Sequence, residues 1–122
     1  MFAGMLQRIA WIILALIHFF PALAMIRPAL ISRLYGVAAG NDIFPLLHHR
    51  AALFFVIFLL CVWSAFDPAS RRVASIGVGI SMVSFLIIYW SAGAPSMLKT
   101  IAIADLIGIP FLAFVTWKAF VR

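Results

Sequence analysis

Five polar side chains lie inside stretches of this chain that are otherwise almost entirely apolar. They comprise two imidazoles, one guanidinium, one hydroxyl and one carboxylate, and they belong to His18, His49, Arg50, Ser84 and Asp105. Such a set can donate and accept hydrogen bonds, form an ion pair or hold a charged ligand. Because an ionisable group in an apolar environment is costly unless it faces a partner or a cavity, these residues form the candidate ligand-binding site.

The stretches that carry these residues have the length and composition of membrane-spanning helices. At about 1.5 Å of rise per residue, each approaches the roughly 30 Å hydrocarbon core of a bilayer. We therefore expect one integral membrane domain over residues 1–122, with an all-α fold that is a bundle of four transmembrane helices. The expected spans are about 9–26, 44–66, 73–91 and 100–118.

The composition supports this class independently of the individual stretches. Hydrophobic residues make up 67% of the chain and charged residues 10%, which excludes an ordinary soluble domain. The first stretch has an alternative interpretation, since Arg8 before an apolar run and the small residues around Ala22 and Ala24 resemble a signal peptide. That run is longer than the usual apolar region of about 7 to 15 residues, so we expect it to remain as a span.

Charge and cysteine content exclude several other classes. Nine Lys or Arg face three Asp, but they are spread over span ends rather than clustered, so nucleic acid is not an expected partner. The headgroups of the lipid bilayer explain these charges better. A single cysteine, Cys61, rules out a disulfide framework or a thiolate metal cluster within one chain, and we expect it to be a small buried hydrophobic residue.

The distribution of basic residues predicts the orientation of the chain. If the N-terminus is cytoplasmic, five basic residues lie on that side and three on the other, which favours cytoplasmic N- and C-termini. The cytoplasmic set would be Arg8, Arg71, Arg72, Lys118 and Arg122, and the opposite set Arg27, Arg33 and Lys99.

The longest connection, residues 27–42, has an amphipathic beginning. Its residues Leu30, Ile31 and Leu34 share one helical face, whereas Arg33 points away from that face. This pattern predicts a short interfacial helix between the first two spans.

Four of the polar residues fall at similar depths in this topology. Counting from the outer span ends places His18, Arg50, Ser84 and Asp105 roughly 7 to 12 Å below the outer surface. Four helices would thus contribute to one polar layer, which is the strongest functional signal in the sequence. We expect one face of each of the last two spans to let a neighbouring helix approach closely. These faces carry Gly77, Ser81, Ser84 and Ser91 in the third span, and Ala102, Asp105, Gly108, Leu112 and Thr116 in the fourth.

Several alternatives compete with a binding site. Arg50 and Asp105 could form a buried ion pair that joins the second and fourth spans without any ligand. The adjacent His48 and His49 point about 100° apart on a helix, so at most one of them joins the layer. His18 could also simply bond to a neighbouring helix.

Two chemical interpretations of the same layer are weaker. Ser84, His18 and Asp105 supply the residue types of a nucleophilic triad, but Arg50 competes for the carboxylate and no oxyanion hole is evident. His18 and His49 could ligate a haem, but a pair of histidines is a weak signal. We therefore assign no catalytic residue, no metal site and no cofactor.

Tryptophans recur near the span ends. Indole rings favour the membrane interface, so we interpret all four as anchors rather than as a cofactor cage. They are Trp11, Trp63, Trp90 and Trp117.

Five segments resemble the recurring blocks of a family of small four-span bacterial inner-membrane proteins. They are IHFFP (17–21), LYG (34–36), LLHHRAALF (46–54), VSFLIIYW (83–90) and IAIADL (101–106), against family blocks written IHLLP, LYG, LLxHRAxLF, SFLxLAW and RxVxxAD. The resemblance covers nearly the whole chain and includes all five candidate residues, although Thr100 or Ile101 stands where the family often has Arg. It implies a multi-pass protein of the bacterial inner membrane, of a family with no established activity.

Two further likenesses accompany this resemblance. Some family members carry the label phosphopantetheine adenylyltransferase, but that enzyme needs an α/β nucleotide-binding fold and an HxGH-type motif, and this chain has neither. The architecture is also similar to that of DoxX-like four-span proteins, by analogy at the level of fold.

Two functions remain open. In the first, the polar layer binds a lipid, a quinone or another small amphiphile, with Arg50 and His49 as donors and Asp105 as the orienting anion. In the second, the protein is a non-catalytic accessory or structural subunit whose partner is another membrane protein or a second copy of itself. Transport is less favoured, because no pair of broken helices is evident.

Overall fold

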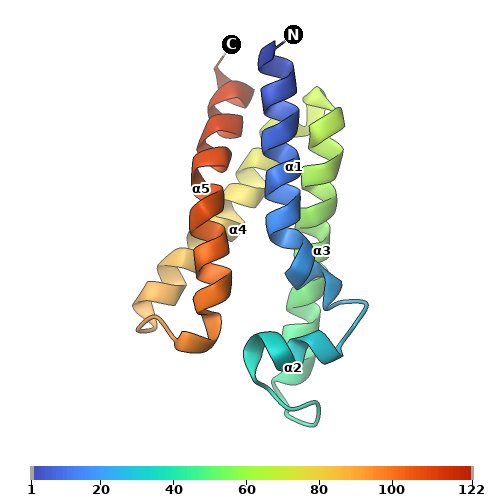
Figure 1. Ribbon diagram of the computed structural model, residues 1–122, viewed down its shortest axis with the longest axis vertical. Helices are drawn as coiled ribbons and strands as arrows, with labels where there is room; N and C mark the ends of the chain where they lie inside the picture. The colour runs from blue at the N-terminus through green and yellow to red at the C-terminus, as the bar shows by residue number, and fades with distance from the viewer. Residues whose placement is uncertain (1, 122) are drawn as a thin grey trace.

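The computed structural model describes the backbone of residues 2–121 and the side chains of residues 4–121, and it is helical throughout apart from its connections. Four helices are long and apolar enough to cross a membrane, which confirms the predicted all-α bundle of four transmembrane helices (Figure 1). The helices are α1 (Phe2–Leu23), α2 (Ala29–Tyr35), α3 (Phe44–Phe66), α4 (Arg71–Ser91) and α5 (Lys99–Phe120), with 3₁₀ turns at Pro68–Ser70 and Ser96–Leu98.

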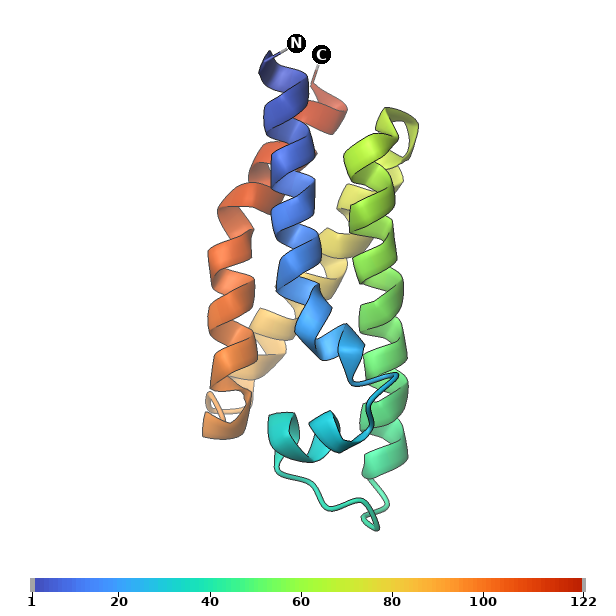
Figure 2. The ribbon, with the colours of Figure 1, turned by 45° about the vertical axis from the view of Figure 1, so that its right-hand side comes forward.

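The four long helices form an incomplete ring. Helix α1 packs extensively against α3 on one side and α5 on the other, and α4 packs against α5, whereas α3 and α4 touch much less. Figures 1 and 2 show α4 passing obliquely behind α1, with α3 and α5 on either side of α1. The order around the bundle is therefore α3, α1, α5, α4, with an opening between α4 and α3.

Both ends of the chain lie at one end of the bundle, and α2 lies at the other (Figure 1). The basic residues Arg8, Arg71, Arg72 and Lys118 belong to helical turns near the end that holds the termini, as the predicted topology requires. Arg122, which was counted with them, lies outside the described residues.

The main apolar core lies between α1, α3, α4 and α5. Trp11 is fully buried in this core, so its predicted role as an interfacial anchor is wrong. It shares a face of α1 with Leu14 and His18, and this face points into the bundle. The other three tryptophans are exposed on the outside of the bundle, and Cys61 is buried as predicted.

Helix α2 is the short amphipathic helix that the sequence predicts. Ile31 is buried against Ala24 and Ala51, while Arg33 is exposed. The helix ends at Gly36, whose φ of 67° lies in the left-handed region that glycine adopts readily. The apolar face of α2 thus packs against the residues that follow α1 and against α3.

Helices α3 and α4 are joined tightly at the end that holds the termini. The Arg71 guanidinium donates to the carbonyl oxygens of Ser64 and Ala65 at 2.7 and 3.1 Å, and to Gln7 Oε1 at 3.2 Å. These bonds satisfy carbonyls in the last turn of α3, where a cation is also favoured by the helix dipole. The two helices are therefore held together at this end of the bundle and diverge toward α2.

Candidate functional site

A groove of about 550 Å³ lies between α3 and α4 in the half of the bundle nearer α2. Most of its wall is aliphatic or aromatic, and Leu53, Ile80 and Ile88 on its rim are exposed to the outside of the bundle. The groove therefore opens sideways, toward the surrounding bilayer. Its polar lining residues are Tyr35, Arg50, Ser81 and Ser84.

Arg50 is held in a fixed position at the wall of this groove. Its Nε donates to the hydroxyl oxygen of Tyr35 at 3.2 Å. Its guanidinium carbon lies 4.7 Å from the centroid of the Phe54 ring and 5.1 Å from that of Phe85, both distances typical of cation–π contacts. Its terminal nitrogens donate no hydrogen bond to any residue that the structure describes. The groove thus contains an oriented cation with free donors.

The predicted ion pair between Arg50 and Asp105 is not formed, since no salt bridge occurs among residues 4–121. Tyr35, Phe54 and Phe85 hold the guanidinium instead. Equal depth in two helices does not make two side chains point toward each other, and this is why the sequence argument failed.

A second hollow of about 80 Å³ contains His18 from α1 and Asp105 from α5, which are only 1% and 3% exposed. The Nδ1–H group of His18 donates to the carbonyl oxygen of Leu14 at 2.8 Å, which leaves Nε2 as an acceptor, and this atom is buried without a partner. The Asp105 carboxylate has no hydrogen-bond partner among the described residues. This small cavity therefore carries two free acceptors.

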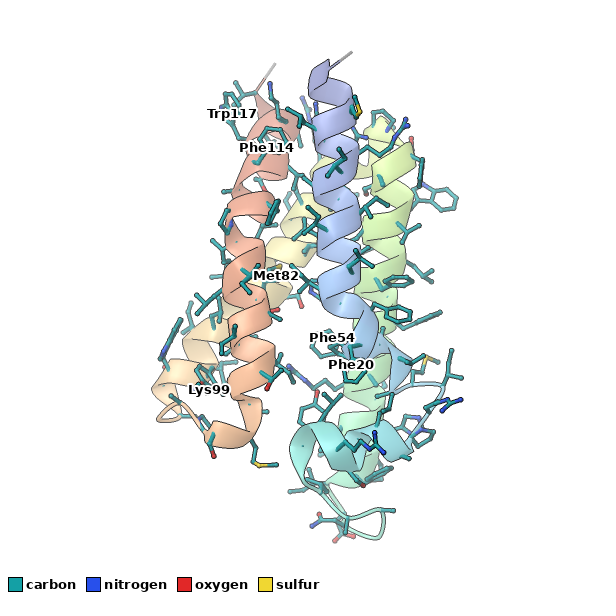
Figure 3. All side chains as sticks on the ribbon, in the orientation of Figure 1. Phe20, Phe54, Met82, Lys99, Phe114 and Trp117 are labelled. Carbon is teal, nitrogen blue, oxygen red and sulfur yellow. The ribbon has the colours of Figure 1, made fainter. Side chains whose placement is uncertain are left out.

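Phe54 forms a wall that the groove and the small cavity share. One side of its ring contacts the Arg50 guanidinium, and the ring centroid lies 5.9 Å from that of His18. Figure 3 shows Phe54 beside Phe20, which also lines the small cavity, near the end of α1 that approaches α2. One aromatic side chain thus contacts the Arg50 cation and also lines the cavity of His18 and Asp105.

The five predicted site residues divide into three groups. Arg50 and Ser84 line the groove, and His18 and Asp105 line the small cavity. His49 is exposed and lines neither hollow. Its neighbour His48 makes the internal contact instead, since its Nε2 donates to the carbonyl oxygen of Met25 at 3.0 Å.

The small residues of α4 line the groove and do not bring two helices together. No atom lies within 4 Å of a Cβ added at Gly77, so the predicted close approach at this face is wrong. The opposite wall carries the bulky side chains of Arg50 and Phe54, which keep α3 away. The close approach occurs at Gly108 of α5, where an added Cβ would lie 2.7 Å from Met82 Cε and 2.8 Å from Ile17 Cδ1.

The weaker chemical alternatives do not match this arrangement. Ser84 lies in the groove and its hydroxyl donates to the Ser81 carbonyl at 3.3 Å, whereas His18 and Asp105 line the other hollow, so no nucleophilic triad is assembled. His18 and His49 do not face a common space. Between residues 4 and 121, no group of three or more His, Cys, Asp or Glu side chains could hold a metal ion.

Sequence reasoning missed the aromatic residues that hold Arg50. Phe54 lies four residues after Arg50 in a helix, a spacing that places two side chains on one face, so this contact could have been predicted. Tyr35 and Phe85 come from other helices, and nothing in the sequence indicates that they meet Arg50.

Comparisons of the chain with protein-family models, with curated proteins and with solved structures give no match. The resemblance to the small four-span family therefore stays a prediction. Its blocks nevertheless contain the residues that the fold brings together here: Tyr35 in LYG, Arg50 and Phe54 in LLHHRAALF, Phe85 in VSFLIIYW, His18 in IHFFP and Asp105 in IAIADL.

Proposed function

We propose that this multi-pass membrane protein binds a small amphiphile, such as a lipid or a quinone, in the groove between α3 and α4. The observation that carries this proposal is the oriented Arg50 side chain, which lines a groove that is otherwise mainly apolar and whose terminal nitrogens bond to no described residue. A polar head and an apolar tail match these two parts. The volume of about 550 Å³ falls in the range usual for small-molecule sites, about 300 to 1,000 Å³.

The positions of the lining residues predict how the ligand would be oriented in the groove. Its head would lie beside Arg50, Tyr35 and Ser84, near α2 and the membrane surface. Its tail would follow Val56 and Ile80 toward the middle of the bilayer. An anionic or strongly accepting head is favoured, because guanidinium groups bind carboxylate and phosphate through two parallel hydrogen bonds.

The proposed location is the bacterial inner membrane, with both termini in the cytoplasm. The excess of Lys and Arg at the end of the bundle that holds the termini supports this orientation. The resemblance of the sequence blocks to the small four-span family supports the inner membrane. In this orientation the groove opens into the outer half of the bilayer.

Filling the groove provides a test. Gly77 lines the groove and Gly79 does not, yet both belong to α4 and a Cβ at either meets no atom within 4 Å. Gly77→Leu should therefore occupy the ligand's space, and Gly79→Leu is its matched control, with the same change in helix propensity. We expect added lipid extract or a short-chain quinone to raise the melting temperature of wild type and Gly79→Leu, but not of Gly77→Leu.

An equal rise in all three proteins would contradict binding in this groove. If ligands stabilise none of them, while Gly77→Leu alone alters the size of the purified complex, the result would overturn amphiphile binding in favour of an accessory or structural subunit. In that function, a helix of a membrane-protein partner or of a second copy would occupy the same opening.

A further inference from the structure

Two side chains of opposite charge type line different hollows of this bundle and do not pair. Arg50 lines the groove and Asp105 lines the small cavity, and neither forms a salt bridge with any described residue. Charges within a membrane are normally paired, because an uncompensated charge there is costly. Contacts with the rings of Phe54 and Phe85 hold the Arg50 guanidinium at the wall of the groove instead.

The two hollows adjoin along a short border. Phe54 lines both of them, and the consecutive residues Leu34 and Tyr35 of α2 line one each. A ligand head that extends past the edge of the Phe54 ring therefore passes from the donors of the groove to the acceptors of the small cavity.

The groove side offers hydrogen-bond donors, whereas the cavity side offers hydrogen-bond acceptors. On the groove side, Arg50 has free N–H groups, and the Tyr35 hydroxyl accepts from Arg50 and so keeps its own proton available to donate. On the cavity side, His18 Nε2 is a buried acceptor without a partner, and the Asp105 carboxylate accepts no hydrogen bond from the residues that the structure describes. A ligand that satisfies all of them needs an anionic part and, next to it, a part with several N–H donors.

We propose that the ligand is a zwitterionic amphiphile whose head joins a phosphate or carboxylate to a primary ammonium group. This inference rests on the proposed function. The anionic group binds Arg50 and Tyr35, and the ammonium group enters the small cavity to bind Asp105 and His18. A trimethylated ammonium is disfavoured because it has no N–H donor to offer the two acceptors of the small cavity.

Lipids that differ only in the head group test this proposal. We expect dioleoyl phosphatidylethanolamine in detergent micelles to raise the melting temperature of the wild-type protein more than dioleoyl phosphatidylglycerol or dioleoyl phosphatidylcholine. N-methyl and N,N-dimethyl phosphatidylethanolamine should fall between, in order of N–H count. This series uses only wild-type protein, so it does not depend on any variant folding.

Two variants then assign the two ends of the head. Asp105→Asn keeps an acceptor oxygen but removes the negative charge, so it should lose about tenfold or more of the affinity for phosphatidylethanolamine and keep its response to phosphatidylglycerol. Arg50→Met should lose its response to every lipid. The exposed residues Asp42 and Arg33 supply the matched controls Asp42→Asn and Arg33→Met, which should behave as wild type.

The outcomes separate this inference from the proposed function. Equal stabilisation of wild type by all the lipids, abolished by Arg50→Met, would overturn the zwitterion and leave amphiphile binding intact. If no lipid stabilises the wild-type protein, both proposals fail.

Discussion

At the scale of single residues, the sequence indicated the polar positions but not their directions. Counting residues along a helix gives depth, and Arg50 and Asp105 line two hollows that share Phe54, but the ion pair expected between them is not formed among the described residues. The direction of each side chain depends on helix rotation and on neighbours from other helices. This is why Arg50 contacts Tyr35 and Phe85 in place of the expected Asp105, and why His49 faces outward.

Tyr35 is predicted to contribute to stability and to ligand binding through its hydroxyl group alone. Tyr35→Phe removes the acceptor of Arg50 Nε and should lower the stability in detergent by about 1 to 2 kcal/mol, since the lost bond involves a charged group. It should also weaken the response to added amphiphile. Thermal unfolding with and without lipid measures both effects.

A matched control for this change is Tyr89→Phe. Tyr89 is buried, and its hydroxyl bonds to no residue between 4 and 121, so its loss should have little effect. Tyr35→Phe should add nothing in an Arg50→Met background, where the donor is already gone. Equal effects of the two tyrosine changes would show that the contact with Arg50 is not what matters.

At the scale of helices, hydropathy predicted the number and order of the elements but described some of their ends poorly. The second span was expected at 44–66, and α3 has these bounds. The first was expected at 9–26, but α1 spans Phe2–Leu23. Apolar composition reports on burial in lipid, whereas a helix ends where its backbone hydrogen bonds end, so Gln7 and Arg8 are helical and Met25 and Ile26 are not.

Arg71 is predicted to stabilise the fold, whereas the sequence suggested only that its charge helps to orient the chain in the membrane. Arg71→Met removes three hydrogen bonds and leaves the Ser64 carbonyl without a side-chain donor. We expect it to destabilise the protein by about 3 kcal/mol or more, as is typical when buried polar groups lose a charged partner. Unfolding in detergent measures this loss.

The adjacent Arg72 serves as the control. It carries the same charge at the same membrane boundary, but it is exposed and makes one hydrogen bond, to the carbonyl of Ala119 at 2.9 Å. Arg72→Met should cost about 1 kcal/mol or less. Similar losses from the two changes would refute the assignment of Arg71 as the residue that fixes the end of α3.

At the scale of the whole molecule, the predicted bundle is confirmed, but the opening in it could not have been foreseen. The stripe of Gly77, Ser81 and Ser84 was expected to draw α4 toward a neighbour, and it lines a groove instead. A small residue gives close packing only where side chains of the facing helices approach it, as Ile17 and Met82 approach Gly108. The facing side chains belong to other helices, so the sequence of α4 alone does not show whether its small residues pack closely.

The topology of the molecule gives a prediction for the intact cell. Both termini lie at one end of the bundle, so reporters fused to either end should show the same location, which we expect to be the cytoplasm (Figure 1). A reporter inserted at the exposed turn around Gly93 should lie outside. Opposite locations for the two terminal fusions would contradict the bundle itself, and a shared external location would contradict only its orientation.

Because the groove opens sideways between α3 and α4, the ligand concentration that matters is the concentration in the bilayer and not in water. A ligand that comes from the bilayer never has to cross water, so the occupancy of the groove depends on its mole fraction in one leaflet. An abundant lipid makes up a large part of that leaflet, and even a weak preference then keeps the groove filled. The groove would thus report on the composition of the membrane around it, and a change in that composition would replace its occupant without any change in the protein.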